Sequence, residues 1–196
     1  MRRYLPHVLI GFATIAIAAC QNNTPTPTPT PAPTPATPTM TPVERGKYLV
    51  NAMGCNDCHT PMKMGAQGPE PDMSRFLSGH PEKEKVAPAP KLTNGWIAAV
   101  NGTGTAWVGP WGISYTANLT PDQNTGLGIW TEDMFLKAIR EGKHMGTSRP
   151  ILPPMPWPAF RNLNDDDLKS IFAYLRTIPA IANHVPDAVI AEAPKK

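Results

Sequence analysis

The sequence predicts an all-α fold with a long loop-rich insertion. Three segments carry both the apolar spacing and the capping residues of helices, and no segment shows a strand pattern of comparable strength. Between residues 60 and 128 the chain is rich in Gly, Pro, Asn and Thr, which predicts turns. We expect one short helical turn there, near Asp72–Ser78, and at most a brief hairpin over Trp107–Tyr115. A connection this long needs something other than helix packing to organise it.

The first helix is predicted to begin after Thr41. Thr41-Pro42-Val43-Glu44 has the pattern of a capping box with proline at the first helical position. Gly54 is expected to end the helix, because glycine adopts the left-handed conformation that commonly follows a last turn. The face predicted to be buried consists of Gly46, Leu49, Val50 and Met53.

Two further helices follow the insertion. The first spans about Thr131–Glu141, ends at Gly142, and should bury Met134, Phe135, Ala138 and Ile139. The second is capped by Asn164, carries three aspartates in its first turn, and is expected to stop before Pro179. Its apolar stripe consists of Leu168, Ile171, Phe172, Leu175 and Ile178.

Residues 1–19 have the pattern of an export signal. Arg2 and Arg3 precede an apolar run that is too short for a mature transmembrane helix. The small residues before Cys20 resemble the lipobox of bacterial lipoproteins, so we expect Cys20 to be lipidated and to become the new N-terminus. The alternative is an ordinary signal peptide with a chance cysteine. The interpretation places the protein in the cell envelope, lipid-anchored and facing the periplasm; Gln21 would favour the outer membrane of a Gram-negative cell.

Residues 20–42 are predicted to form the lipidated cysteine and a Thr/Pro-rich tether. Alternating Thr and Pro cannot form a ladder or bury apolar surface, so the segment should be extended and polyproline-like. At about 3.1 Å per residue it would reach roughly 60 Å. The predicted domain then covers residues 43–182, and residues 183–196 form a C-terminal tail.

The motif Cys55-x-x-Cys58-His59 predicts one covalently attached haem c. In this pattern the two thiols add to the porphyrin vinyl groups, and the adjacent imidazole binds the iron. Three alternatives are weaker. A zinc site needs about four ligands, a thioredoxin-like pair needs a βαβ context, and a disulfide between Cys55 and Cys58 would close a short, strained loop. With Cys20 assigned to lipid, the three cysteines are all used and no disulfide is expected.

Met155 is the predicted sixth ligand of the iron, opposite His59. It lies in a proline-rich segment, "ILPPMPWPAF", whose stiffness suits a fixed thioether ligand. Most of the nine methionines are expected to be ordinary packing residues. The alternative ligands that remain are Met145, His144 and His80.

Much of the domain resembles the class I cytochromes c, in particular bacterial periplasmic cytochromes related to the cytochrome subunits of membrane-bound alcohol dehydrogenases. The resemblance is carried by "ERGKYLV", "GCNDCHTP", "FLSGHP", "ANLTPD", "TGLGIWTEDMFLKAIREGKHMG" and "ILPPMPWPAFRNLNDDDLKSIFAYLRTIP". It implies a cytochrome c-like helical fold around one covalent haem. It also implies that the first and last helices cross where a small residue meets an aromatic one, with Gly46 and Tyr174 as candidates and Phe172 as the alternative. Those dehydrogenase subunits carry several haems, whereas this chain has one attachment motif.

The function predicted from these residues is one-electron transfer between a dehydrogenase and an oxidase or another cytochrome, by a membrane-tethered carrier that is not an enzyme. The alternative is a haem enzyme of peroxidase or nitrite-reducing type, which would need a displaceable sixth ligand. The balance of 18 Lys and Arg against 15 Asp and Glu gives no strong charged pole, and no basic patch predicts nucleic-acid binding. Residues that could meet the haem propionates are Trp130, Trp157, Arg149 and Arg161.

Overall fold

The computed structural model describes residues 40–86 and 88–191. The predicted leader, Cys20 and most of the predicted tether lie outside these residues. Within the described ranges no helix is both long enough and apolar enough to cross a membrane.

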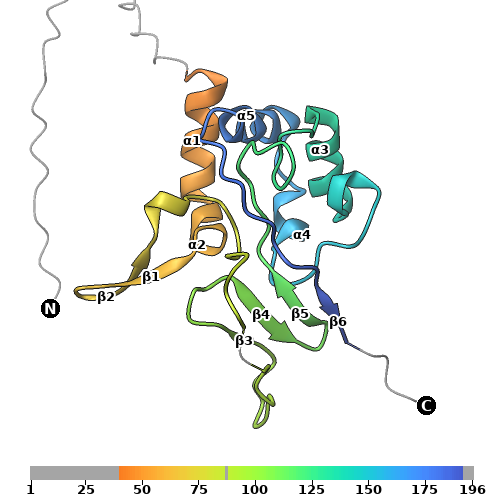
Figure 1. The fold of residues 1–196 in the computed structure, drawn as a ribbon. Coiled ribbons are helices and arrows are strands. Elements are labelled where there is room, and N and C mark those ends of the chain that lie inside the picture. Colours follow the sequence, from red (N-terminus) through yellow and green to blue (C-terminus); the bar gives the residue numbers. More distant parts are fainter. Residues whose placement is uncertain (1–39, 87, 192–196) are drawn as a thin grey trace, which may run out of the picture. The chain divides into compact units, whose positions relative to one another are not determined.

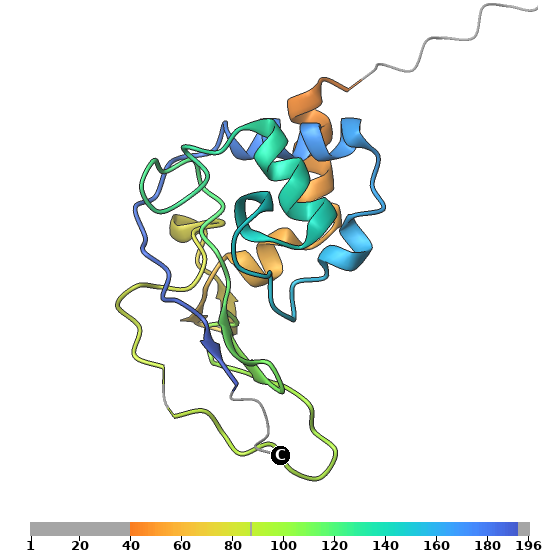
Figure 2. The ribbon, with the colours of Figure 1, turned by 90° about the vertical axis from the view of Figure 1, so that its right-hand side faces the viewer.

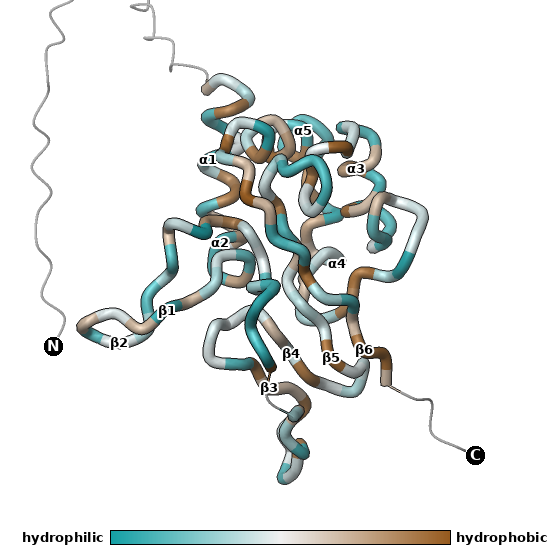
Figure 3. Tube along the Cα trace, viewed as in Figure 1, coloured by the Kyte–Doolittle hydropathy of each residue, from teal (hydrophilic) through white to brown (hydrophobic). Residues whose placement is uncertain are grey.

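Three helices form what we call the helical frame: α1 (Pro42–Ala52), α3 (Glu132–Glu141) and α5 (Asp165–Leu175). All three begin as the sequence predicted, with Thr41, Thr131 and Asn164 accepting hydrogen bonds from backbone amides of the first turn. Along α1 and α5, hydrophilic and hydrophobic residues alternate around the helix, as expected for helices with one buried face (Figure 3).

The helices α1 and α5 cross at Gly46. A Cβ atom on this residue would lie 1.8 Å from the Ser170 carbonyl oxygen and 2.8 Å from the Tyr174 Cβ. The predicted contact between Gly46 and Tyr174 is therefore confirmed. Only glycine allows the two backbones to approach this closely.

Four short helical segments connect the frame to the rest of the chain. One of them, η1, lies inside the short helical turn predicted near Asp72–Ser78, while the segments after α3 and before α5 had no distinct sequence pattern. They are α2 (Cys55–His59), η1 (Met73–Arg75), η2 (His144–Gly146) and α4 (Trp157–Phe160).

The prediction of an all-α fold is wrong, because the described chain is mixed α/β with two antiparallel sheets (Figure 1). One sheet pairs β1 with β2, and the other has the order β3-β4-β5-β6. The hairpin suspected over Trp107–Tyr115 is present as β4 and β5. The strands are β1 (Met62–Gly65), β2 (Gly68–Pro71), β3 (Ala99–Val100), β4 (Ala106–Gly109), β5 (Gly112–Tyr115) and β6 (Val189–Ile190).

The strand β6 comes from the region predicted to be a tail. It pairs with β5 in the register Gly112↔Ile190 and Ile113↔Val189, and the two lie side by side (Figure 2). A Cβ atom on Gly112 would lie 1.9 Å from the Val189 carbonyl oxygen, so this glycine lets β6 approach. Strands of two to four residues are too short for an alternating pattern to show in the sequence.

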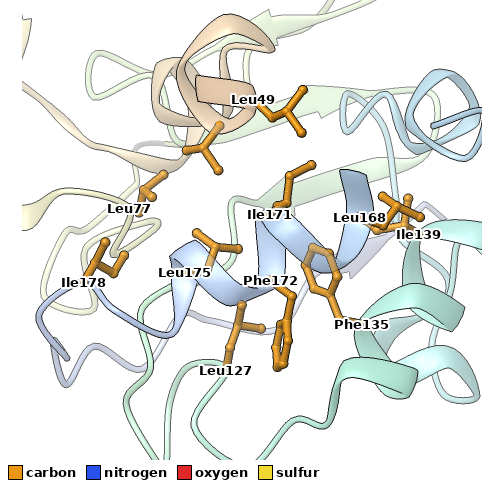
Figure 4. Packing of buried hydrophobic residues seen from close by; sticks show 11 residues of the cluster. Leu49, Leu77, Leu127, Phe135, Ile139, Leu168, Ile171, Phe172, Leu175 and Ile178 are labelled. Carbon is orange, nitrogen blue, oxygen red and sulfur yellow. The ribbon is translucent and has the colours of Figure 1, made fainter. Parts of the chain in front are cut away.

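The apolar core lies between the helices of the frame and the loops that follow the motif (Figure 4). Phe135 of α3 and Phe172 of α5 pack with their ring centroids 5.3 Å apart. Ile178 is buried although it follows the end of α5. The buried cluster consists of Leu49, Val50, Leu77, Leu127, Phe135, Ile139, Leu168, Ile171, Phe172, Leu175 and Ile178.

The C-terminal segment 181–190, which we call the strap, is fixed to the insertion by polar side chains. Asn183 is 3% exposed, and its amide nitrogen donates to the carbonyls of Ser78 and His80 at 2.7 and 2.8 Å. Its amide oxygen accepts from Arg75 and from the backbone of Glu82. One buried amide thus holds segments about a hundred residues apart in the chain.

Candidate haem site

The motif residues lie on α2, which follows α1 after two residues, Met53 and the left-handed Gly54. Gly54 has φ 69° and ψ 28°, a conformation that glycine adopts without strain. This turn starts a new helix directly after α1, and α2 then carries Cys55, Cys58 and His59 on little more than one turn. The predicted attachment residues are therefore held by a helix that packs against the frame.

His59 is buried and its ring is oriented by one hydrogen bond. Its Nδ1 lies 2.7 Å from the Ala117 carbonyl oxygen. A carbonyl only accepts, so the proton is on Nδ1 and the lone pair of Nε2 is available to a metal. Burial lowers the pKa of His59, which favours the neutral imidazole that a metal ligand must be.

Both motif cysteines are free thiols, so the structure has no disulfide between Cys55 and Cys58. Burial, with a smaller contribution from Asp57, raises the pKa of Cys55 to about 11, and burial also raises the pKa of Cys58. Across residues 40–86 and 88–191, no three His, Cys, Asp or Glu side chains are grouped to hold a metal ion.

The segment that receives the His59 hydrogen bond is one whose role the sequence did not reveal. Asn118 is buried, and its side-chain oxygen accepts from the Thr120 amide at 3.0 Å and the Thr120 hydroxyl at 2.7 Å. Its amide nitrogen donates to the Ile181 carbonyl at 2.8 Å. Asn118 and Thr120 therefore position Ala117. An Asn two residues before a Thr is a recognisable turn signal that could have indicated this.

The residue after the motif supports His59 from the other side. The Thr60 hydroxyl is fully buried and accepts from the Leu77 amide at 3.0 Å. The Gly79 amide donates to the His59 carbonyl at 2.8 Å. A Cβ on Gly79 would lie 2.5 Å from the Thr116 carbonyl oxygen, so this glycine permits the packing. The insertion thus forms the wall beside the imidazole.

Met155 is partly buried and packs against the same apolar cluster as Cys55. Met145, the alternative thioether, has a left-handed backbone at φ 54° and is not among the residues packed on that cluster. The imidazole of His80 is fully buried, with Nδ1 2.8 Å from the Thr105 hydroxyl. His144 lies edge-on to Trp130 with ring centroids 5.1 Å apart. These positions favour Met155 over its alternatives, and the assignment remains a prediction.

The four residues considered for the haem propionates have other contacts. The Trp157 ring lies against Gly142, where a Cβ would come within 2.2 Å of it, and the Arg161 guanidinium lies 5.7 Å from the Trp157 ring centroid. Trp130 packs on the core and meets His144. Arg149 is exposed. None of these contacts indicates a propionate role.

The donor set fits haem c. It consists of two free thiols and a neutral, oriented imidazole on one short helix, with a thioether on the same apolar cluster. Bound haem would supply an iron that changes between two oxidation states. The residues that would hold it are Cys55, Cys58, His59 and Met155.

The chain belongs to the cytochrome c family, because the family's model matches residues 43–179. The sequence-based identification as a c-type cytochrome is confirmed, and with it covalent haem c and electron transfer as its chemistry. The expectation that the chain is not itself an enzyme is also confirmed by its relatives, which include cytochrome subunits.

Three relatives illustrate the similarity. The chain is 30% identical over 135 residues, 69% of its length, to the fructose dehydrogenase cytochrome subunit of Gluconobacter japonicus. It is 30% identical over 132 residues, 67% of its length, to the gluconate 2-dehydrogenase cytochrome c subunit of Pantoea cypripedii. It is 36% identical over 81 residues, 40% of its length, to the cytochrome c subunit of alcohol dehydrogenase (quinone) of Gluconobacter oxydans. The matches cover 21%, 22% and 17% of these longer proteins.

Proposed function

We propose that the protein is a single-haem electron carrier that takes electrons from a dehydrogenase and delivers them to an oxidase or another cytochrome, while tethered to a membrane of the cell envelope by a lipid on Cys20. The observation that carries the haem assignment is His59: a buried, neutral imidazole whose Nδ1 is fixed by the Ala117 carbonyl. The single Cys-x-x-Cys-His motif supports one haem.

The dehydrogenase as electron donor is supported by the names of the relatives. Two of them are cytochrome subunits of fructose dehydrogenase and of alcohol dehydrogenase (quinone). The matches cover only 21% and 17% of those two proteins, so we propose the class of the electron donor, a dehydrogenase, and not a particular enzyme. The tether would let one carrier reach both a donor and an acceptor at a membrane surface.

The surroundings of His59 and Met155 would limit the structural change at the iron ligands that accompanies electron transfer. The Ala117 carbonyl fixes the His59 ring, and the core packing around Met155 fixes the thioether. A soft thioether favours the reduced iron, so His/Met ligation should give a potential in the upper part of the roughly 0.8 V range of protein haems.

The test is the optical spectrum and potential of the haem-loaded protein and of Met155→Ala. The wild type should show the weak far-red sulfur-to-iron band when oxidised and should not bind carbon monoxide readily when reduced. Met155→Ala should lose the band, lower the potential and bind carbon monoxide, while retaining covalent haem.

The matched control is Met145→Ala, which should leave all three measurements unchanged. If the band survives in Met155→Ala and is lost in Met145→Ala, the ligand assignment is wrong. If the unmutated reduced protein binds carbon monoxide readily, the sixth ligand is displaceable and the carrier proposal fails.

The lipid anchor is tested separately. Mature wild-type protein should carry the diacylglyceryl mass on Cys20 and sediment with membranes, whereas Cys20→Ala should lack that mass. An unlipidated mature N-terminus in the wild type would contradict the anchor without affecting the haem assignment.

A further inference from the structure

A loop before β3 presents two large apolar side chains to solvent. Trp96 is 71% exposed and Ile97 is 74% exposed. The segment 91–97, which we call the tip, belongs to the part of the insertion that projects beyond the four-stranded sheet, away from the helical frame (Figures 1 and 2). Adjacent exposed apolar residues of this size on a projecting loop indicate a binding surface.

The tip is built on a defined turn. Asn94 and Gly95 both have positive φ, 57° and 85°, and the Trp96 amide donates to the Thr93 carbonyl at 3.2 Å. This turn directly precedes Ile97 and includes Trp96, so the two exposed side chains are adjacent in the chain.

One lysine of the tip and two lysines that precede it in the same insertion are exposed. Lys83, Lys85 and Lys91 are exposed, and none of the ion pairs among the described residues involves them. The nearby carboxylates are directed back to the domain: Glu84 accepts hydrogen bonds from the insertion, and Glu82 lies 3.4 Å from the His184 amide nitrogen.

Glu84 in particular is held by two donors. The Asn101 amide donates to its Oε1 at 2.9 Å and the Thr103 hydroxyl to its Oε2 at 3.0 Å. These bonds turn the Glu84 side chain toward the insertion, and Lys83, Lys85 and Lys91 are exposed cations that form no ion pair among the described residues.

We propose that the tip inserts into the interface of a phospholipid membrane that carries anionic headgroups. Tryptophan prefers the headgroup level of a bilayer, an adjacent isoleucine gains from contact with the acyl chains, and lysines attract anionic phosphates. The contact is reversible and non-covalent, and it adds a second point of attachment to the lipid proposed on Cys20.

The proposed tether is long enough for this arrangement. The tip lies at the end of the domain away from the start of α1 (Figure 1). A domain of this size is about 40 Å across. The roughly 60 Å expected for an extended Thr/Pro tether exceeds this dimension, so its length allows the proposed lipid and the tip to meet the same membrane. The contact would hold the domain in one orientation at the surface.

The experiment uses the haem-loaded chain with Cys20→Ala, exported behind a leader that is cleaved without lipidation, so that binding is not due to the anchor. It is floated with vesicles of phosphatidylethanolamine and phosphatidylglycerol, and haem absorbance reports the bound fraction. Trp96→Ser with Ile97→Ser should reduce the partition constant about tenfold or more. Vesicles of phosphatidylcholine alone should bind the parent chain more weakly than the anionic vesicles.

The matched control is Met64→Ser with Met73→Ser, which removes side chains that are 78% and 64% exposed elsewhere in the insertion. This variant should bind as the parent does. Equal binding by the tip variant and the parent, or no binding to anionic vesicles, overturns the proposal. If sedimentation velocity shows a dimer for the parent chain and a monomer for the tip variant, the tip binds a second copy of the chain instead of a membrane. Neither outcome affects the haem assignment or the lipid on Cys20.

Discussion

The helical frame and the insertion are stabilised by different interactions. In the frame, the residues buried most completely are apolar, such as Leu168 and Leu175, each 1% exposed. In the insertion and the segments attached to it, several of the most buried residues are polar: Ser78, His80, Thr105 and Thr120 are all fully buried. The frame therefore depends on volume and close approach, whereas the insertion depends on hydrogen bonds between buried polar groups, although Ser78 Oγ and His80 Nε2 have no partner among the described residues.

This difference determines what kind of substitution each region tolerates. A frame position tolerates a change that preserves shape, and an insertion position tolerates a change that preserves donors and acceptors. The four predictions below test the distinction.

The largest effect is expected for Gly46→Ala. The added methyl group would lie 1.8 Å from the Ser170 carbonyl oxygen, so α1 and α5 must separate along their contact. We expect a loss of about 4 kcal/mol or more in the free energy of unfolding, measured by denaturant unfolding of the haem-loaded domain. The control is Gly102→Ala, because a Cβ at Gly102 meets nothing within 4 Å. Equal stability of the two variants would mean that the frame does not depend on this contact.

The second prediction is for Asn183→Ala, which removes one side chain that satisfies four backbone or side-chain partners. The buried carbonyls of Ser78 and His80 lose their donor, so we expect a destabilisation of about 2–4 kcal/mol. Faster amide hydrogen exchange should appear around residues 77–82 and not in α5.

The control for this prediction is Asn162→Ala, since that side chain bonds only to carbonyls in its own exposed turn. If Asn183→Ala accelerates amide hydrogen exchange equally over the whole domain, the insertion does not open independently of the frame.

The third prediction concerns a helix cap. The Asn164 side chain accepts from the Asp167 amide at 2.7 Å. Asn164→Ala should destabilise the domain by about 1 kcal/mol, and Asn164→Ser should restore most of that stability because serine also caps. If Asn164→Ala destabilises the domain as much as Gly46→Ala does, the stability of the frame depends on local capping as much as on close packing.

The smallest effect is a pH dependence from His80. Burial lowers its pKa from the usual value of 6.5; Glu84 opposes this shift and Arg75 adds to it. Below pH 6.5 the unfolded chain binds a proton more readily than the folded chain does, so stability falls as the pH drops from 6.5 toward the lowered folded pKa. Above pH 6.5 this contribution is fully present.

The measurement compares the denaturation midpoints of wild type and His80→Gln at neutral and mildly acidic pH. Glutamine can still bond to Thr105 but does not titrate. The difference in denaturation midpoint between wild type and His80→Gln should change between neutral and mildly acidic pH. A constant difference would show that His80 does not contribute to the pH dependence.

The sequence predicted the frame well for a physical reason. Thr41, Thr131 and Asn164 act through neighbours three residues away, and the apolar stripes follow the helical repeat, so the information is local. The attachment residues were equally accessible because Cys55, Cys58 and His59 are adjacent in the chain.

The sheets and the support of the site were not predictable in the same way. The strand β6 is defined by pairing with residues about 75 positions earlier, and Asn183 by partners about a hundred positions away. A strand of two residues is too short to show the alternation of apolar and polar residues that predicts longer strands. The role of the Ala117 carbonyl belongs to the backbone, so its only trace in the sequence is the neighbouring turn signal of Asn118 and Thr120, which does not by itself point to His59.

The pairing of β6 with β5 also has a consequence for the order of events during synthesis. The edge of β5 is available early, but its partner strand at Val189–Ile190 is made among the last residues of the described chain. Until then the β5 edge stays open, in the state that attracts strands of other chains. The β5 edge at Gly112 is therefore completed only by residues 189–190, and a chain interrupted before residue 189 would keep that edge uncovered.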